Sequence, residues 1–522
     1  MVEYRTSLYI AKISFITMPS RASVRKSVWE ALKELEFGEN TKFLENTQNI
    51  VHNNTLISFR VRELPEEGIY LLSFFPCGEN TSLWRKIENI KATQDTLNFC
   101  DLIGDQLSVI VEEGIIHFSR QFLRDSETID ISDWEVSFMA ISPPEKEQLS
   151  DFLQKVRETN YEHVLKKVPK GKSFLLFTQT YLKEGEIIEI LKILLRKFGR
   201  ISGPKSLITA REFGERFSDK ANTAFIFVEK RGMLEAWYKA LKIFFDSQRI
   251  ATQYIVDNTI TQKITSWAGV RANLILEIMT KLGSNPVILR PPEEIVDTNG
   301  FLCLSSIESA TRRLFGALFM YSKGGLEVEE EVQIYQDIEF HIREGSLEIP
   351  SDKVDVLSEK ISKLIGKEMK IDILLTIEWN KESLRKLIEK LKKNGIHTNR
   401  VYYVSSKTSR YVDSYLLDGH MRSNTHPFLK VGRKVAFLKS STDIRIYANL
   451  SSLFIKLVWP SDGEIKLEDL EKMLWLVKKR IYRIQEFFVL KIPEPIHVFK
   501  NVRNMYLGEF KEKLTIPLRL LI

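Results

Sequence analysis

The segment from residue 300 to residue 377 constrains the fold more than any other part of the sequence. Three short runs rich in Ile, Val, Leu, Phe and Tyr follow one another there with tight links: FLCLSSI, LFGALFMYSK and EEEVQIYQ. Such runs, with Lys-Gly-Gly between the second and the third, predict antiparallel strands. The amphipathic run DKVDVLSEKISKLIGK then predicts a crossover helix, and IDILLTI predicts a further strand beside the first.

This order of elements is that of the ribonuclease H type of fold, in which three antiparallel strands precede a helix and a parallel fourth strand. The sequence continues with further strand-like runs and one long helical run: VYYVSS, KVAFLKS, DIRIYAN, LFIKLVWP and EDLEKMLWLVKKRIYRIQEFF. We therefore place a ribonuclease H-like domain at residues 293–522.

A different order of elements precedes this unit. Strand-like SFLLFTQT, TAFIFVEK and IATQYIV alternate with helical segments, the last of which ends at Lys281 and returns to a strand in PVILR. Strands that alternate with helices predict a doubly wound, largely parallel sheet. We assign this Rossmann-like domain to residues 166–292.

The first 165 residues predict an α+β module with a mostly antiparallel sheet. Short β-type runs alternate with turns there, and VRKSVWEALKEL is a clear helix. A second helical stretch begins at Glu145 and leads to the basic KKVPKGK, whose Pro and Gly mark a boundary. The expected fold class is α/β multidomain, with an N-terminal α+β module, a Rossmann-like domain and a ribonuclease H-like domain.

The composition argues against several classes of protein. The three cysteines have no CxxC spacing and the eight histidines form no HExxH pair, so neither a zinc site nor a disulfide framework is indicated. No apolar run is long enough for a signal sequence or a membrane span, so we expect a cytoplasmic protein. The net charge of +7 mildly favours polyanionic partners such as nucleic acid.

Four polar residues of the Rossmann-like region could together bind a terminal phosphate: Tyr238, Lys242, Gln253 and Lys281. Two lysines and an amide supply charge and fixed donors, and a tyrosine can stack on a base and donate its hydroxyl. Each residue also has a simpler interpretation. Tyr238 and Lys242 fit an exposed i, i+4 pair, and Gln253 fits a polar loop residue. Lys281 fits a cation that is favoured by a helix C-terminus.

The order of these residues, followed by a ribonuclease H-like domain, resembles the MID and PIWI halves of an Argonaute protein. In that family a Tyr-x-x-x-Lys pair on one helix, a Gln after the next strand and a Lys just before Leu-Gly hold the phosphorylated 5′ end of a guide strand. The segments AWYKALK, IATQYIV and IMTKLG carry these residues in the same order. The resemblance implies that residues 166–292 form a guide-binding MID domain and residues 293–522 a PIWI domain.

Glu277 departs from the commonest pattern of the family, in which a second lysine stands one turn before the Lys-Leu-Gly lysine. Some prokaryotic members place there a Gln that binds a divalent cation together with the C-terminal carboxylate. The resemblance therefore implies a Mg²⁺ shared by Glu277, the guide phosphate and the carboxylate of Ile522, since Glu is a hard oxygen ligand. Alternatively, the apolar ending PLRLLI simply packs on the core.

The carboxylates that the family uses for two-metal cleavage are missing from their expected positions. Ser305 stands where the first Asp is expected in the first PIWI strand, and Ile377 or Glu378 falls near the place of the second. IPEPIHVFKNV matches the Pro-x-Pro segment of the family but puts Lys500 at the place of the last ligand, where a cation repels metal ions. His497 fits a packing or hydrogen-bonding residue. We therefore expect a catalytically inactive PIWI domain and a protein that is not an enzyme.

Residues 1–165 carry no PAZ pattern, so the chain resembles a short, PAZ-lacking Argonaute of a prokaryote or an archaeon. The resemblance implies the guided sensor of a defence system, with a short 5′-phosphorylated guide, a complementary target, a protein partner that supplies the missing N-terminal lobe, and an effector protein. An RNA guide with a DNA target is favoured, although no local motif distinguishes RNA from DNA. Basic stretches at 384–400 and 477–483 follow the phosphates in this interpretation, or are ordinary solvated helix faces.

Two other interpretations stay open at the level of sequence. The chain could be an active guided nuclease that uses Glu378 with Asp372 or Glu308. Cleavage of a paired target that is lost on Glu378→Ala would establish this activity. The chain could also be a scaffold subunit of a defence complex that binds no guide.

Overall fold

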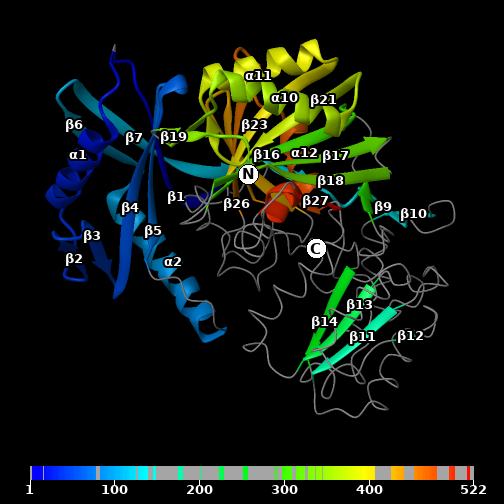
Figure 1. Ribbon diagram of the computed structural model, residues 1–522. Helices are drawn as coiled ribbons and strands as arrows, with labels where there is room; N and C mark the ends of the chain where they lie inside the picture. Colours follow the sequence, from blue (N-terminus) through cyan, green and yellow to red (C-terminus); the bar gives the residue numbers. More distant parts are fainter. Residues whose placement is uncertain are drawn as a thin grey trace. The chain divides into compact units, whose positions relative to one another are not determined.

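The computed structural model divides the chain into two compact units. The first comprises Met1–Ile131, Tyr403–Leu470 and Leu490–Ile492, and the second comprises Ser132–Tyr402, Glu471–Val489 and Pro493–Ile522. Each unit thus combines segments that are far apart in the sequence, as the colours of Figure 1 show. The structure describes residues 3–15, 17–77, 83–124, 127–138, 145–148, 174–179, 201–202, 223–228, 251–256, 288–290, 297–308, 313–323, 327–335, 337–343, 345–405, 425–439, 452–478, 493–499 and 514–517. The predicted domain boundaries at 165/166 and 292/293 lie outside these residues and stay predictions.

The first unit is built on a seven-stranded antiparallel sheet with the order β2-β3-β4-β5-β1-β7-β6. Its strands are β1 (Glu3–Lys12), β2 (Thr41–Leu44), β3 (Asn49–His52), β4 (Thr55–Leu64), β5 (Ile69–Pro76), β6 (Gln106–Val111) and β7 (Gly114–Arg124). Two helices accompany it, α1 (Arg21–Glu34) and α2 (Leu83–Ile103). The predicted antiparallel sheet and the helix near residue 24 are confirmed, whereas α2 has no counterpart among the predicted elements.

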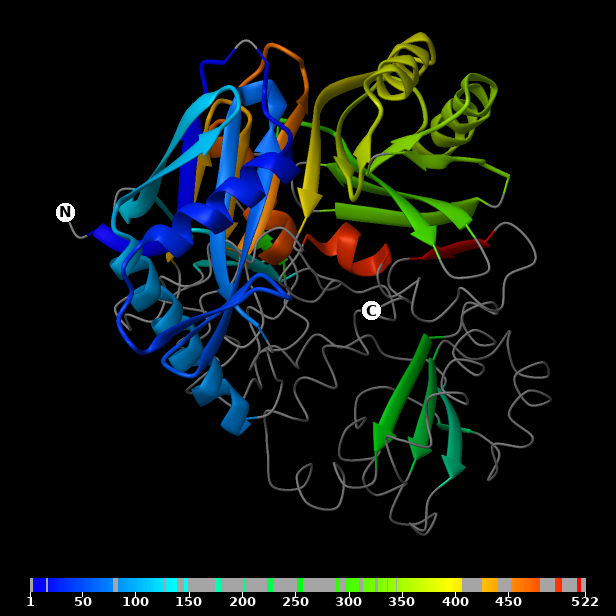
Figure 2. The same cartoon turned by 90° about the vertical axis from the view of Figure 1, so that its left-hand side faces the viewer.

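Both helices cover the same face of this sheet (Figure 2). The Ser20 side chain caps α1 by accepting a hydrogen bond from the Ser23 N–H at 3.1 Å. The buried residues of α1 recur at helical spacing, and among them Trp29 stacks on Phe59 of β4 with ring centroids 6.1 Å apart. From α2, Phe99 meets Phe74 of β5 edge to face. An aromatic core therefore holds the two helices on the sheet.

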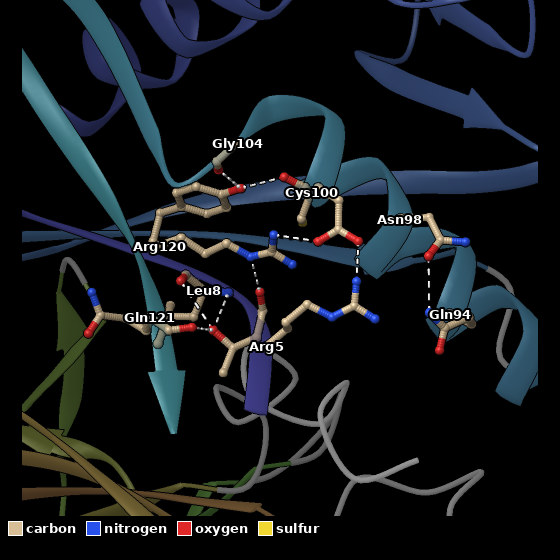
Figure 3. Close-up of polar contacts among 11 residues, drawn as sticks. Arg5, Leu8, Gln94, Asn98, Cys100, Gly104, Arg120 and Gln121 are labelled. Atoms are coloured by element: carbon tan, nitrogen blue, oxygen red, sulfur yellow. Dashed lines mark hydrogen bonds and ion pairs between the residues drawn. The ribbon is translucent and has the colours of Figure 1, made fainter. Parts of the chain in front are cut away.

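A charged network ties the end of α2 to strands β1 and β7 (Figure 3). Asp101 accepts a hydrogen bond from Arg120 at 2.7 Å and another from Arg5. Arg120 is buried, and its Nε donates to the carbonyl of Thr6 at 2.9 Å, where β1 shifts register against β7. A buried guanidinium needs such compensation, so these bonds fix both the irregular part of β1 and the end of α2.

The opposite face of the sheet packs on strands from the C-terminal part of the chain. The strands are β24 (Thr425–Val431), β25 (Val435–Lys439) and β26 (Ser452–Trp459). β25 pairs antiparallel with both β24 and β26, and β8 (Thr128–Asp130) pairs antiparallel with the other side of β24. Apolar side chains of both layers form one core: Leu8, Leu64, Ile69, Leu71, Leu429, Val431, Val435, Phe437 and Phe454. Because strand residues alternate between faces, Leu8 and Leu71 serve this core while Tyr9 and Leu72 serve the helical one.

Glu67 joins the same two layers through the backbone. It ends the short turn η1 (Pro65–Glu67), and its carboxylate accepts the N–H groups of Arg433 and Lys434, both at 3.0 Å, in the turn between β24 and β25. Gly432, just before them, has a φ of +69°, and a Cβ there would come within 2.5 Å of Glu67 Oε2. Glycine is needed at this position for its left-handed backbone and for the close approach of the carboxylate.

We predict that Gly432→Ala destabilises the protein by about 2 to 4 kcal/mol, because it adds left-handed strain and displaces a carboxylate from two backbone donors. Gly104→Ala is the matched control, since Gly104 also has a positive φ, +87°, with open space where its Cβ would lie. The measurement is the denaturant midpoint of each variant against the wild type. Equal losses for the two variants would show that the approach of Glu67 contributes nothing to stability.

The second unit contains the predicted ribonuclease H-like order. β16 (Gly300–Glu308) and β18 (Glu327–Tyr335) both pair antiparallel with β17 (Arg313–Lys323), and β27 (Leu514–Pro517) pairs with β18. Helix α10 (Ser351–Ile365) crosses over to β21 (Met369–Leu375), which pairs with β16 in parallel. Helix α11 (Lys381–Lys393) then leads to β23 (Ile396–Ser405), the next neighbour of β21. The predicted meander, crossover helix and parallel strand are confirmed.

Three helices pack on this sheet or on one another. Figure 1 shows α10 and α11 side by side, and Asn394 Nδ2 donates to Ser362 Oγ at 2.9 Å where the two helices end. Asn380 caps α11 by accepting the N–H groups of Glu382 and Ser383. Helix α12 (Leu467–Lys478) brings Trp475 against Phe301 of β16, with ring centroids 5.8 Å apart.

The second unit also contains the predicted parallel sheet. Its strands are β11 (Phe174–Gln179), β12 (Ile201–Ser202), β13 (Thr223–Val228) and β14 (Ala251–Val256), in the order β12-β11-β13-β14. All its pairs are parallel, as the alternation of strands and helices predicts. The helices predicted between these strands lie outside the described residues.

Two predicted elements of this region are wrong. PVILR was expected to join the parallel sheet, but β15 (Ile288–Arg290) pairs antiparallel with β9 (Glu135–Phe138). The residues from Glu145 were expected to start a helix, but β10 (Glu145–Gln148) pairs with the other side of β9. In both segments the pairing with β9, which no local pattern encodes, decides the structure.

Candidate nucleic-acid site

The parallel pairing of β16 with β21 brings Ser305 beside Thr376. The register of the two strands ends with Leu304 opposite Leu375, and Ser305 and Thr376 are the residues that follow in each strand. Thr376 Oγ1 donates to Ser305 Oγ at 2.7 Å, and Ser305 Oγ donates to the carbonyl of Ser306 at 3.2 Å. The Thr376 N–H also donates to the Leu304 carbonyl at 3.3 Å. Ser305 is buried, and both hydroxyls of the pair are hydrogen-bonded. The carboxyl end of β21 therefore carries two neutral, bonded hydroxyl groups.

The resemblance predicts an acidic side chain of a nuclease at the position of Ser305, beside Thr376. Two-metal cleavage depends on inward carboxylates, because hard divalent cations require charged oxygen ligands. Ser305 lies where the sequence predicts it, and its neighbour Thr376 is equally without charge. Among the residues that the structure describes, no three His, Cys, Asp or Glu side chains form a group that could hold a metal ion.

The other residues considered for catalysis lie in other secondary-structure elements or outside the described residues. Glu378 starts β22 (Glu378–Trp379), which pairs with β20 (Ser346–Glu348) in a separate three-stranded sheet that also contains β19 (His341–Arg343). His497 lies in a helical turn at 494–499, where its N–H donates to the Pro493 carbonyl at 3.1 Å. Lys500 lies outside the described residues.

Asp372, a metal ligand in the active-nuclease interpretation, belongs to a buried network of hydrogen bonds. Its carboxylate accepts hydrogen bonds from Lys472 Nζ at 2.8 Å and from both Asn399 Nδ2 and the Arg400 N–H at 3.1 Å. The side chain is fully buried, and it lies four residues before Thr376, about 13 Å along the strand. Both carboxylate oxygens of Asp372 already accept hydrogen bonds, one of them from the Lys472 ammonium, and this network argues against Asp372 as a metal ligand.

Lys472 joins this buried carboxylate to a second one. Its Nζ also donates to Asp297 Oδ1 at 2.8 Å, just before β16, and Asp297 accepts further bonds from Lys370 and Asn399. Burial raises the pKa of Asp372. Burial alone would lower the pKa of Lys472, but the charge of Asp372 raises it. Partial burial acts to raise the pKa of Asp297, yet its bond with Lys472 lowers it. The ammonium therefore stays charged and compensates the buried carboxylate.

We predict that Lys472→Met destabilises the protein by about 3 to 5 kcal/mol, because it leaves a buried aspartate without its counter-ion. Lys370→Met is the matched control, since Lys370 also contacts Asp297 but is exposed, and should cost about 1 kcal/mol or less. Denaturant midpoints of the two variants provide the comparison. If the double variant Lys472→Met with Asp372→Leu is no more stable than Lys472→Met alone, the ion-pair explanation is wrong.

The predicted guide-phosphate residues are mostly outside the described part of the chain. Gln253 is the third residue of β14, opposite Phe225 of β13, so it lies within the strand instead of after it. Tyr238, Lys242, Glu277, Lys281 and Ile522 all lie outside the described residues. The phosphate pocket and its magnesium ion therefore stay predictions.

Two functional features escaped the sequence analysis. Thr376 was not singled out, because its importance comes from a strand register and not from a motif. Lys472 follows three acidic residues in the helical run EDLEKMLWLVK and has the sequence context of an ordinary charged helix residue. The available signal was Asp372 itself, since a carboxylate in the middle of an apolar strand requires a buried partner.

Comparison with known proteins identifies the fold. No family model and no curated protein matches the sequence. Among solved structures, the Argonaute of Clostridium butyricum bound to a guide DNA and a 19-mer target DNA matches with a TM-score of 0.57 and 10% identity, over 96% of this chain and 87% of that one. The chain has an Argonaute fold. The Argonaute of Methanocaldococcus jannaschii also matches, with a TM-score of 0.53 and 13% identity, over 96% of this chain and 74% of that one.

The Argonaute likeness reaches beyond the motifs that first indicated it. Those motifs lie in the MID-like and PIWI-like parts, whereas the structural match covers 96% of the chain and thus includes most of the N-terminal module. None of the helices that the structure describes is long and apolar enough to cross a membrane.

Proposed function

We propose that this chain binds a short guide strand and recognises a complementary target without cutting it. The observation that carries the proposal is the hydrogen bond between Thr376 and Ser305, because it pairs two uncharged side chains at the position where the resemblance predicts the first carboxylate of a nuclease. The Argonaute fold supports the guided part, since the matching Clostridium butyricum protein was solved with a guide DNA and a target DNA. Base pairing with the guide would supply specificity.

The proposed guide-end site consists of Tyr238, Lys242, Gln253 and Lys281. The two lysines would supply positive charge to the 5′ phosphate, Gln253 a fixed amide donor, and Tyr238 a stacking surface for the first base. The parallel sheet of β11, β13 and β14 supports a ligand site in this domain, because doubly wound sheets bind ligands beyond the carboxyl ends of their strands. Gln253 lies within β14, so its part in the site rests on the resemblance alone.

A magnesium ion is part of the proposal at this site only. Glu277 and the carboxylate of Ile522 would hold it beside the guide phosphate, where it would neutralise charge. The described residues contain neither ligand, so the assignment depends on the sequence resemblance. The ion would have a binding role here and no part in cleavage.

A protein that recognises a target without cutting it needs another protein to act on the result. We therefore place the chain as the sensor of a prokaryotic or archaeal defence assembly, with one protein partner and one effector. The uncharged Ser305 and Thr376 pair supports this role. Purification of the tagged chain from its host without any protein partner would contradict it.

The guide-end site is tested by replacing Lys242 and Lys281 together with alanine. The affinity for a 5′-phosphorylated guide should fall by about a hundredfold or more, since two charge-assisted contacts are lost. The affinity for the same strand with a 5′ hydroxyl should change by less than about tenfold, because that strand never makes those contacts. Equal losses for both strands would show that these lysines do not read the phosphate.

Lys239→Ala with Lys263→Ala is the matched control, because it removes the same charge from the same part of the sequence. It should leave the preference for a 5′ phosphate unchanged. The same assay with EDTA tests the magnesium assignment, since chelation should weaken phosphate-dependent binding in the wild type. Indifference to EDTA would remove Glu277 and Ile522 from the site without affecting the lysines.

A further inference from the structure

Four exposed lysines gather where α10 and α11 end: Lys363, Lys367, Lys392 and Lys393. We call this surface the lysine end. The bond between Asn394 and Ser362 at 2.9 Å joins the last turns of the two helices, and Gly395 lies against the backbone of Glu368. Each lysine lies within five residues of these contacts along the chain, so the four ammonium groups share one end of the helix pair.

The lysine end is distinguished by the absence of counter-ions. Four other cations of these helices are paired: Lys360 with Asp337, Lys386 with Glu382, Arg385 with Glu389 and Lys390 with Asp355. In the part of the chain that the structure describes, none of the four lysines has a hydrogen bond or an ion pair. The helix C-terminus favours a cation near it by about 0.3 to 1 kcal/mol, which compensates only in part for four converging charges.

This surface is separate from the pair of Ser305 and Thr376. α10 leads into β21 and α11 leads into β23, so the lysine end lies at the amino ends of these strands (Figure 1). The hydroxyl pair lies at the carboxyl end of β21. The length of β21, seven residues or about 23 Å, lies between them. A nucleic-acid strand bound near Ser305 and Thr376 would therefore not contact these lysines through the same phosphates.

We propose that the lysine end binds the phosphate backbone of nucleic acid outside the guided site, without reading its sequence. This inference rests on the proposed function in choosing nucleic acid as the partner. Lysines act as point charges toward phosphate, whereas base reading favours the planar fork of arginine. Such a surface would hold the flanks of a long target while the guide tests its sequence.

The chemistry of the surface favours nucleic acid over two other polyanionic partners. Lysine is depleted in protein–protein interfaces, whose centres are aromatic or apolar. Peripheral attachment to a membrane uses apolar side chains beside the cations. The exposed large hydrophobic residues of the described part are Leu44, Leu102, Ile110, Ile115, Val356 and Leu467, and none belongs to the lysine end.

The test uses unguided duplex DNA of mixed sequence, so its outcome does not depend on guide binding. The variant replaces Lys363, Lys367, Lys392 and Lys393 with glutamine, and binding is measured over a series of salt concentrations. The slope of log affinity against log salt should become shallower by about 2 to 4, because each lost phosphate contact removes about 0.9. The affinity at low salt should fall by at least about tenfold.

The matched control replaces Lys353, Lys381, Arg385 and Lys386 with glutamine, which removes the same charge from the first halves of the same helices. Its slope should change by less than about 1. Equal changes in the two variants would overturn the proposal, since the effect would then be one of net charge. Unchanged DNA binding together with lost binding to phosphatidylserine vesicles would also overturn it and assign the surface to a membrane.

Discussion

The parallel pairing of β16 with β21 is the contact on which the rest of the second unit depends. It places Ser305 beside Thr376 at one end and Phe301 opposite Asp372 at the other. Helix α12 then has to supply two different side chains to the same sheet, Trp475 against Phe301 and Lys472 against Asp372. A change of register by one residue would move every one of these side chains to the other face of the sheet.

Charge is handled in opposite ways inside the second unit and on its surface. Inside, Lys472 is placed between two carboxylates, so that the buried aspartate is compensated and fixed. At the lysine end, exposed cations are left without partners in the described part of the chain. The first arrangement contributes to folding, whereas the second leaves charge available to a ligand. The hydroxyl pair of Ser305 and Thr376 is uncharged.

The ribonuclease H-like order could be predicted because each of its elements has its own local pattern, from FLCLSSI to IDILLTI. PVILR and the residues from Glu145 could not, since their strands are defined by pairing with β9. For the same reason, Ser305 could be singled out from the sequence through the resemblance, while its bond to Thr376 depends on a contact 71 residues away. A buried lysine such as Lys472 is identified only by the helix packing that buries it.

Recognition of a target without cleavage is the central property that we propose for this chain. The decisive measurement loads the purified chain with a 5′-phosphorylated guide, adds an end-labelled complementary target with Mg²⁺ or Mn²⁺, and follows binding and strand length together. We expect guide-dependent binding of the target, which stays intact. A product cut at a fixed distance from the guide's 5′ end would contradict it, because the uncharged pair of Ser305 and Thr376 would then belong to a working nuclease.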